Sequence, residues 1–146
     1  MEVQLAYSTK LNNNRFVVRC IRVARDIKTV KFIIDTGAQF SCIHYSLIDS
    51  NLCEEDISSC ETKIIRGVIE GESVKLYKYR LKQFTIGNIN IGEQDIWITF
   101  DKRVTDTVLG MDILQKVIFI VNSYDNKIYF CKDAEDYEKN FQLKIE

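Results

Sequence analysis

The chain has 146 residues, the length of a typical single domain, and we expect one domain over residues 1–146. With 20 basic and 21 acidic residues the formal net charge is −1, so charge gives no reason to expect binding to nucleic acid or to an anionic membrane. The apolar runs fall well short of the ~20 residues that cross a bilayer, and we expect no membrane segment.

The cysteines and the N-terminal residues indicate a reducing compartment. The chain has five cysteines, an odd number, and it does not begin with a basic segment followed by an apolar one, as a secretion signal would. We therefore expect reduced thiols and a cytoplasmic protein. The cysteines are Cys20, Cys42, Cys53, Cys60 and Cys131.

The first third of the chain predicts short strands and one short helix. Strands are expected over Val3–Ser8 and over Phe16–Val23, which is rich in β-branched residues. A third is expected over Val30–Ile34, whose last three residues are all apolar, a pattern that favours burial on both faces. A short helix is expected over Ser46–Leu52.

The rest of the chain continues this pattern. Its expected elements are a hairpin of Lys63–Ile69 and Val74–Phe84 with Glu70 and Gly71 at the tip, a strand over Ile96–Phe100, a helix over Met111–Lys116, a strand pair of Val117–Val121 and Lys127–Phe130, and a helix over Asp133–Asn140. The sequence therefore predicts a mostly β protein with one or two short helices, and many short strands at this spacing favour a barrel or a sandwich.

A carboxylate follows the most apolar of these strands directly. Asp35 comes after Ile34 and is followed by Thr36, Gly37 and Ala38. A charged side chain at the end of a buried strand is costly unless the chain holds it at a surface. The small residues that follow predict a tight turn that presents the carboxylate at a cleft, where the glycine allows close approach of a ligand.

One carboxylate does not suffice for hydrolysis of a peptide by acid–base catalysis. One group must take a proton from water while another gives a proton to the carbonyl oxygen, and two aspartates achieve this by sharing one proton. The chain has one Asp-Thr-Gly; the stretches at 106–108 and 49–51 begin similarly but lack the glycine. If the chemistry is real, the second Asp35 comes from a second copy across a two-fold axis.

Two motifs resemble those of one enzyme family. The stretch from Phe32 to Gln39 (FIIDTGAQ) is similar to the active-site segment of retropepsin-like aspartic peptidases, and Val108–Leu114 (VLGMDIL) to their second signature. The resemblance covers roughly Arg15 to Phe130 and is closest to cellular and bacterial members with Gly-x-Asp-x-Leu. It implies a closed β-barrel of the acid protease type and a homodimeric endopeptidase that cleaves protein or peptide substrates without a metal or organic cofactor.

The resemblance also implies roles for single residues. Asp35 is then catalytic, Thr36 hydrogen-bonds across the dimer, Gly37 offers its backbone to substrate, and Ala38 completes the active-site loop. Gly110 lets its strand pack beneath that loop.

The remaining implied roles concern substrate binding and dimerisation. The hairpin tip of Val68, Ile69, Glu70 and Gly71 forms a flap over the substrate, which Gln39 also contacts. The strand-like termini pair between subunits, and the tail over residues 131–146 is a candidate for the dimer interface.

The sequence departs from the viral pattern at two positions. Viral members often carry an aspartate and an arginine that form an ion pair where this chain has Gln39 and Met111, so that pair is absent. The acidic residues Glu70 and Glu72 beside the flap tip disfavour acidic substrates.

Three other interpretations remain open. The fold could serve as a catalytically silent dimerisation or peptide-binding module. Cys42 and His44, alternate residues of one strand, could form a nucleophile site, or a zinc site with Cys53 and Cys60, although the spacing fits no common zinc pattern and favours buried thiols beside an ordinary histidine. The basic and aromatic residues from Lys75 to Lys82 could bind single-stranded nucleic acid, or form the solvated face of a hairpin.

Overall fold

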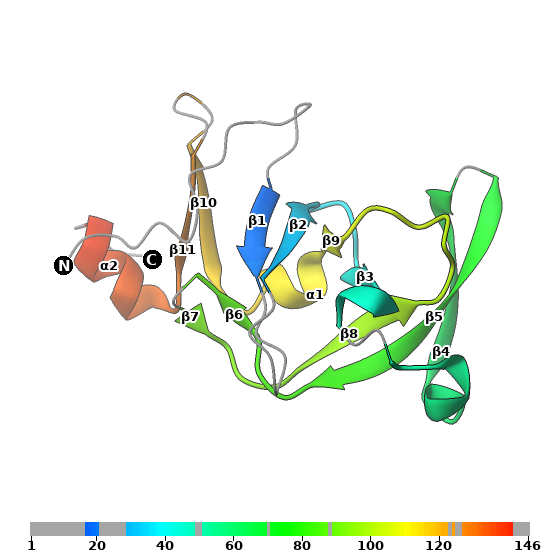
Figure 1. Cartoon of the computed structure of the whole chain (residues 1–146). Helices are drawn as coiled ribbons and strands as arrows, with labels where there is room; N and C mark the ends of the chain where they lie inside the picture. The colour runs from blue at the N-terminus through cyan, green and yellow to red at the C-terminus, as the bar shows by residue number, and fades with distance from the viewer. Residues whose placement is uncertain are drawn as a thin grey trace.

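A computed structural model of the chain describes residues 17–20, 29–48, 51–69, 71–87, 89–122, 124 and 127–141. The strand expected over Val3–Ser8 lies outside these residues. The elements, in chain order, are β1 (Val17–Cys20), β2 (Val30–Ile34), β3 (Cys42–His44), the 3-10 helices η1 (Tyr45–Leu47) and η2 (Glu54–Ile57), β4 (Thr62–Ile69), β5 (Glu72–Leu81), β6 (Thr85–Ile86), β7 (Ile89–Asn90), β8 (Gln94–Thr99), β9 (Val108–Leu109), α1 (Met111–Leu114), β10 (Ile118–Asn122), β11 (Lys127–Cys131) and α2 (Ala134–Phe141) (Figure 1).

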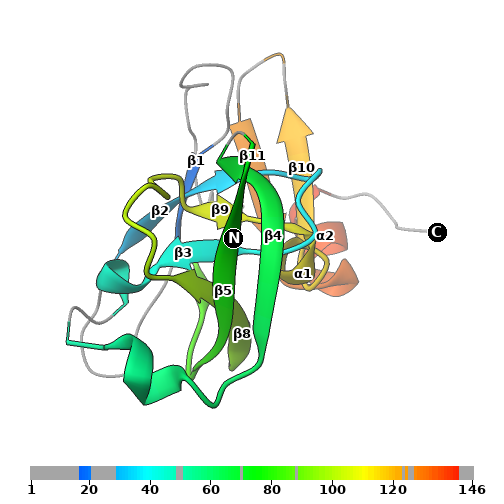
Figure 2. The same cartoon turned by 90° about the vertical axis from the view of Figure 1, so that its right-hand side faces the viewer.

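The described strands form one large sheet and one separate hairpin. Nine strands pair in the order β4-β5-β8-β3-β9-β2-β1-β6-β7, and β10 pairs with β11 alone (Figures 1 and 2). The prediction of a mostly β chain with few short helices is confirmed. The closed barrel is not confirmed, because β4 and β7 end the nine-stranded sheet and no described ladder joins them.

The centre of the large sheet joins distant parts of the sequence. β2 pairs antiparallel with β1 and parallel with β9, in the register Ile33 to Val108 and Ile34 to Leu109. β3 pairs antiparallel with β9 and parallel with β8. The expected burial on both faces of β2 is wrong: Val30 and Phe32 are buried on one face, but on the other face Lys31 is exposed and Ile33 is only half-buried.

The predicted hairpin is confirmed as β4 and β5, which form the tall pair at the right of Figure 1. Gly71 follows β4 with a φ of 73°, the left-handed region that favours glycine. β5 ends at Leu81, and Phe84 beyond it is fully buried in the core. Because β4 is an edge strand, Ile64 leaves 70% of its surface exposed.

Two of the expected helices, now η1 and α1, are shorter in the structure than the sequence predicted. The helix expected over Ser46–Leu52 is replaced by the single 3-10 turn η1, closed by a bond from the Ile48 N–H to the Tyr45 carbonyl. Leu47 is exposed, whereas Ile48, directly after η1, is buried in the core, and residues 49 and 50 lie outside the described part of the chain. α1 ends at Leu114, two residues before the expected end. α2 is close to its predicted range, and none of the described helices is long and apolar enough to cross a bilayer.

Two apolar clusters hold these elements together. The larger one takes buried side chains from β2, β3, β5, β8, β9, α1 and β11. The smaller one consists of Cys42, Val74, Leu76, Trp97 and Val104, with two partly buried residues, one from the loop after β2 and one from β4, packed against it. The smaller cluster therefore joins the hairpin to the centre of the sheet.

Replacement of Ile43 by alanine tests the larger cluster. Ile43 is fully buried in β3, so Ile43→Ala should lower the free energy of unfolding by about 2–5 kcal/mol, from lost burial and the cavity left behind. Ile64→Ala removes the same atoms from a side chain that is 70% exposed, so it should change the free energy of unfolding by less than about 0.5 kcal/mol. Urea unfolding of both variants measures the difference; equal losses would contradict this assignment of the core.

Candidate active site

Asp35 lies where β2 leaves the sheet. Its N–H still donates to the Leu109 carbonyl at 3.0 Å, which continues the ladder between β2 and β9. Its side chain, together with Thr36 and Gly37, is exposed. In the view of Figure 1 this loop leaves the upper end of β2 and lies between the β4–β5 and β10–β11 hairpins. The last residue of a central strand thus places an aspartate at the surface.

The backbone of the loop holds the carboxylate. The Gly37 N–H donates to Asp35 Oδ1 at 2.9 Å, and the Ala38 N–H donates to the Asp35 carbonyl at 3.1 Å. A Cβ on Gly37 would lie 3.2 Å from that same Oδ1. A side chain at this position would crowd the oxygen that the backbone binds, so the glycine serves the orientation of the carboxylate.

Gly110 packs directly against this loop. A Cβ there would lie 2.8 Å from the Ala38 carbonyl oxygen and 2.8 Å from the carbonyl carbon and oxygen of Phe40. These are backbone atoms that cannot move aside independently. Next to it, the Met111 N–H donates to the Ala38 carbonyl at 2.8 Å and the Asp112 N–H donates to the Gln39 carbonyl at 3.3 Å. The two motifs of the sequence are therefore in contact.

A side-chain link that the sequence analysis did not predict joins the same two segments. The Ser41 N–H donates to both carboxylate oxygens of Asp112 at 3.0 Å, and the Ser41 hydroxyl donates to Asp112 Oδ1 at 2.6 Å. The Gly110 N–H in turn donates to Ser41 Oγ at 2.9 Å. The only sequence signal was the acidic residue two positions after Gly110.

The hairpin positions expected to bind substrate are only partly described. Val68 and Ile69 end β4, Gly71 forms the turn, and Glu70 lies outside the described residues. Glu72 begins β5 and forms an ion pair with Arg103.

That arginine lies on the loop that leads into β9. Arg103 also binds the Asp101 carboxylate with two nitrogens, at 2.7 and 3.0 Å. The sequence analysis missed Arg103, which connects the hairpin to this loop. The contact is exposed, so its contribution to stability is small.

Cys42 and His44 do not form a nucleophile site. Burial raises the pKa of the Cys42 thiol to about 12, so it is protonated at neutral pH. His44 instead places Nδ1 2.7 Å from Ser46 Oγ at the start of η1. Within the part of the chain that the structure describes, no three His, Cys, Asp or Glu side chains come together as a metal site would require.

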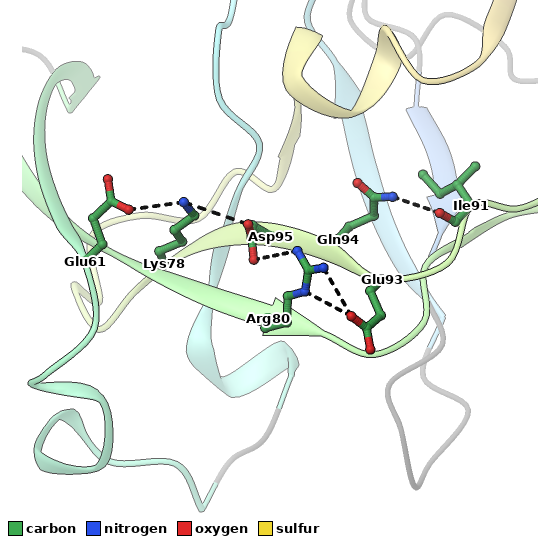
Figure 3. Close-up of polar contacts among 7 residues, drawn as sticks. All are labelled: Glu61, Lys78, Arg80, Ile91, Glu93, Gln94 and Asp95. Carbon is green, nitrogen blue, oxygen red and sulfur yellow. Dashed lines mark hydrogen bonds and ion pairs between the residues drawn. The ribbon is translucent and has the colours of Figure 1, made fainter.

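Two of the basic residues of β5, Lys78 and Arg80, form ion pairs with acidic residues. Lys78 contacts Glu61 at 3.1 Å and Asp95 at 3.8 Å (Figure 3). Arg80 contacts Asp95 at 3.2 Å and a further acid, Glu93, at 3.1 Å. Three carboxylates thus surround two cations, and this face offers no concentrated positive charge to a nucleic acid.

Gly110→Ala should disturb the contact between the two motifs. The added methyl group meets backbone atoms at 2.8 Å, so we expect a loss of about 1–3 kcal/mol in the free energy of unfolding. Amide chemical shifts of residues 35–41 should move with it. Gly71→Ala is the comparison, because its Cβ meets no atom within 4 Å and only the left-handed backbone opposes it. Unmoved shifts in the loop of Gly110→Ala would contradict the close packing.

Alkylation of the native protein tests the assignment of the cysteines. Near neutral pH the exposed Cys53 should react with iodoacetamide, although its hydrogen bond to Asp56 raises the pKa of the thiol and slows it. Cys42 should react at least about 100-fold more slowly until the protein unfolds, because it stays protonated and buried. Peptide mass mapping separates the two sites, and Cys53→Ser provides the blank. Fast labelling of Cys42 would restore the nucleophile hypothesis.

Comparisons with known proteins agree with this geometry. The family model described as aspartyl protease matches residues 21–113, more than half of the chain. No curated protein matches the sequence significantly. Among solved structures, a retropepsin-like aspartic protease from Rickettsia conorii superposes with a TM-score of 0.58 at 13% identity, over 81% of this chain and 90% of that one. The retroviral protease-like domain of Ddi1 from Leishmania major gives 0.48 at 18% identity, over 80% and 93%. The chain therefore belongs to the aspartyl protease family and has a retropepsin-like fold.

Proposed function

We propose that this protein is an aspartic endopeptidase that acts as a homodimer. The observation that carries the proposal is the placement of Asp35. It is an exposed carboxylate, held by the Gly37 N–H at 2.9 Å, on a loop bound to the second motif of the family. For an aspartate with a purely structural role, we would expect the carboxylate oxygens to accept hydrogen bonds from groups in the interior of the fold.

A second copy supplies the rest of the chemistry. Each chain has one Asp-Thr-Gly, and a dyad needs two carboxylates that share a proton. Since Asp35 is exposed, a two-fold axis beside it can bring two such loops together. Thr36, exposed next to Asp35, then lies where it can bond across the axis.

The reaction proceeds without a covalent enzyme intermediate. The ionised carboxylate of the pair takes a proton from water, the water oxygen bonds to the peptide carbonyl carbon, and the protonated carboxyl gives its proton to the carbonyl oxygen. Proton transfer to the amide nitrogen then lets the carbon–nitrogen bond break and releases an acid and an amine. The reaction needs one carboxylate ionised and the other protonated, so activity is expected to fall at both extremes of pH.

The substrate of the proposed peptidase is an extended peptide that binds between the loop and the hairpin. Gly37 and Gln39 on the loop are exposed, and the end of β4 with Gly71 lies on the hairpin above the smaller apolar cluster. Closure of this hairpin over the peptide would exclude water. Glu72 lies near the tip, but its ion pair with Arg103 offsets its charge, so this residue alone gives little selection against acidic peptides.

Asp35→Asn should abolish cleavage without unfolding the protein. An amide cannot share the proton, so we expect cleavage of a diverse peptide library to fall by at least about 100-fold. The library is incubated from about pH 3 to about pH 8, which spans the range over which such dyads titrate. Glu55→Gln, an equal charge change on the exposed η2, should keep the activity of the wild type.

Mixed dimers test the shared site. If wild type and Asp35→Asn are refolded together in equal amounts, random pairing places half of the wild-type chains in mixed pairs, so activity per wild-type chain should fall to about half. Unchanged activity per chain would exclude a shared dyad. An inert wild-type dimer over the whole pH range would instead indicate the catalytically silent module.

A further inference from the structure

We infer that Asp112 and Ser41 are positioning residues that fix the Asp35 loop in the register its chemistry requires. The inference rests on the proposed function, but it gives a role to two side chains, Asp112 of the second motif and Ser41, to which the sequence analysis gave none. The two ends of the loop differ in how they are held. The exposed Asp35 carboxylate accepts a hydrogen bond from the Gly37 N–H, whereas Ser41 at the other end forms several hydrogen bonds to the second motif.

The Asp112 carboxylate is the centre of that binding. Its Oδ1 accepts hydrogen bonds from the Ser41 hydroxyl at 2.6 Å, the Ser41 N–H at 3.0 Å and the Ile113 N–H at 2.9 Å. Its Oδ2 accepts a further bond from the Ser41 N–H at 3.0 Å. The residues are 71 positions apart in the sequence, so these bonds join two distant segments. Charge-assisted bonds of this kind are the stronger ones in proteins.

Ser41 is completely buried, and both functions of its hydroxyl are used. The hydroxyl donates to Asp112 and accepts the Gly110 N–H at 2.9 Å. A chain of hydrogen bonds therefore runs from the backbone of Gly110 through Ser41 to Asp112. Without the hydroxyl, the buried Gly110 N–H loses this acceptor.

These hydrogen bonds fix the position of the Asp35 loop. The loop spans only residues 35–41, with Asp35 bound to Leu109 at one end and Ser41 bound to Asp112 at the other. Gly110 packs against the middle of the loop so closely that an added Cβ would lie 2.8 Å from backbone atoms of Ala38 and Phe40. Loss of the Ser41 end frees the loop to shift, and a displacement of about 1 Å at a reacting carboxylate can cost 100-fold in rate.

Alanine variants at both positions test the inference by kinetics. Ser41→Ala and Asp112→Ala should each lower kcat about 10- to 100-fold with little change in KM, because peptide binding is retained while the dyad is misplaced. The kcat of the double variant should be little lower than that of either single variant, since both substitutions break the same series of hydrogen bonds. Asp112→Asn keeps an oxygen that can accept at the Oδ1 position and should restore part of kcat.

The matched control is Asp56→Ala. Asp56 also accepts the N–H at the start of a short helix, from Cys53 at 3.1 Å, but it lies on the exposed η2. Its loss should lower stability and leave kcat as in the wild type. A fall in kcat of Asp112→Ala no larger than that of Asp56→Ala would overturn the inference, because the pair would then be merely structural.

Amide exchange tests the loop even if no activity is found. The reporters are the N–H groups of Asp35 and Met111, which bond to the carbonyls of Leu109 and Ala38 and so lose no partner in the variants. Their exchange should speed up at least about 10-fold in Ser41→Ala and Asp112→Ala, since the segments separate. The Lys78 N–H in β5 should not change.

The outcomes separate the two proposals. Faster exchange with an inert wild type would refute the peptidase function and leave the loop-fixing role standing. Unchanged exchange at both reporters would overturn the role of the pair whatever the activity. If Asp112→Ala does not fold, Asp112→Asn takes its place in both measurements, with a smaller effect in the same direction.

Discussion

The close contact between residues 35–41 and 109–112 is the constraint on which the rest of the structure depends. It combines a glycine with no room for a Cβ, backbone bonds from Asp35 to Leu109 and from Met111 to Ala38, and a buried serine bound to Asp112. Each of these needs the others, because the side-chain bonds form only if the backbones approach as closely as Gly110 permits. The result is a fixed base beneath an exposed carboxylate.

The sheet makes this contact possible. β2 and β9 are parallel neighbours although they are far apart in sequence, and β3 pairs with the other side of β9. The loop between β2 and β3 must therefore pass over the end of β9, where Gly110 lies. Functional residues on a short loop gain precision when a rigid sheet holds both of its ends.

The two apolar clusters support different parts of the molecule. The larger one packs side chains of the sheet against those of α1, while the smaller one packs the hairpin against the centre of the sheet. Phe40 belongs to the edge of the smaller cluster, and the Lys63 ammonium of β4 lies 3.4 Å from its ring centre. The residue that follows Gln39 in the loop thus contacts the hairpin directly. Packing therefore connects the loop to the hairpin.

The sequence alone determined the main elements and the position of Asp35. The apolar run before Asp35 and the glycine after it predicted a strand and an exposed turn, because these depend on local geometry and on small residues. The close packing of Gly110 against the loop was expected only from the resemblance to a known family. The β4–β5 hairpin followed from its alternation and its glycine. Such features are encoded within a few residues.

Tertiary structure decided what depends on distant partners. The link from Ser41 to Asp112 and that from Arg103 to Glu72 join segments that no local pattern relates. The basic stretch of β5 was open to two interpretations, and the ion pairs of Lys78 and Arg80 favour the solvated face of a hairpin, since charges on neighbouring strands are adjacent in space and remote in sequence. Of the helix expected after His44, the described residues form one 3-10 turn, and Ile48 directly after it is buried in the core.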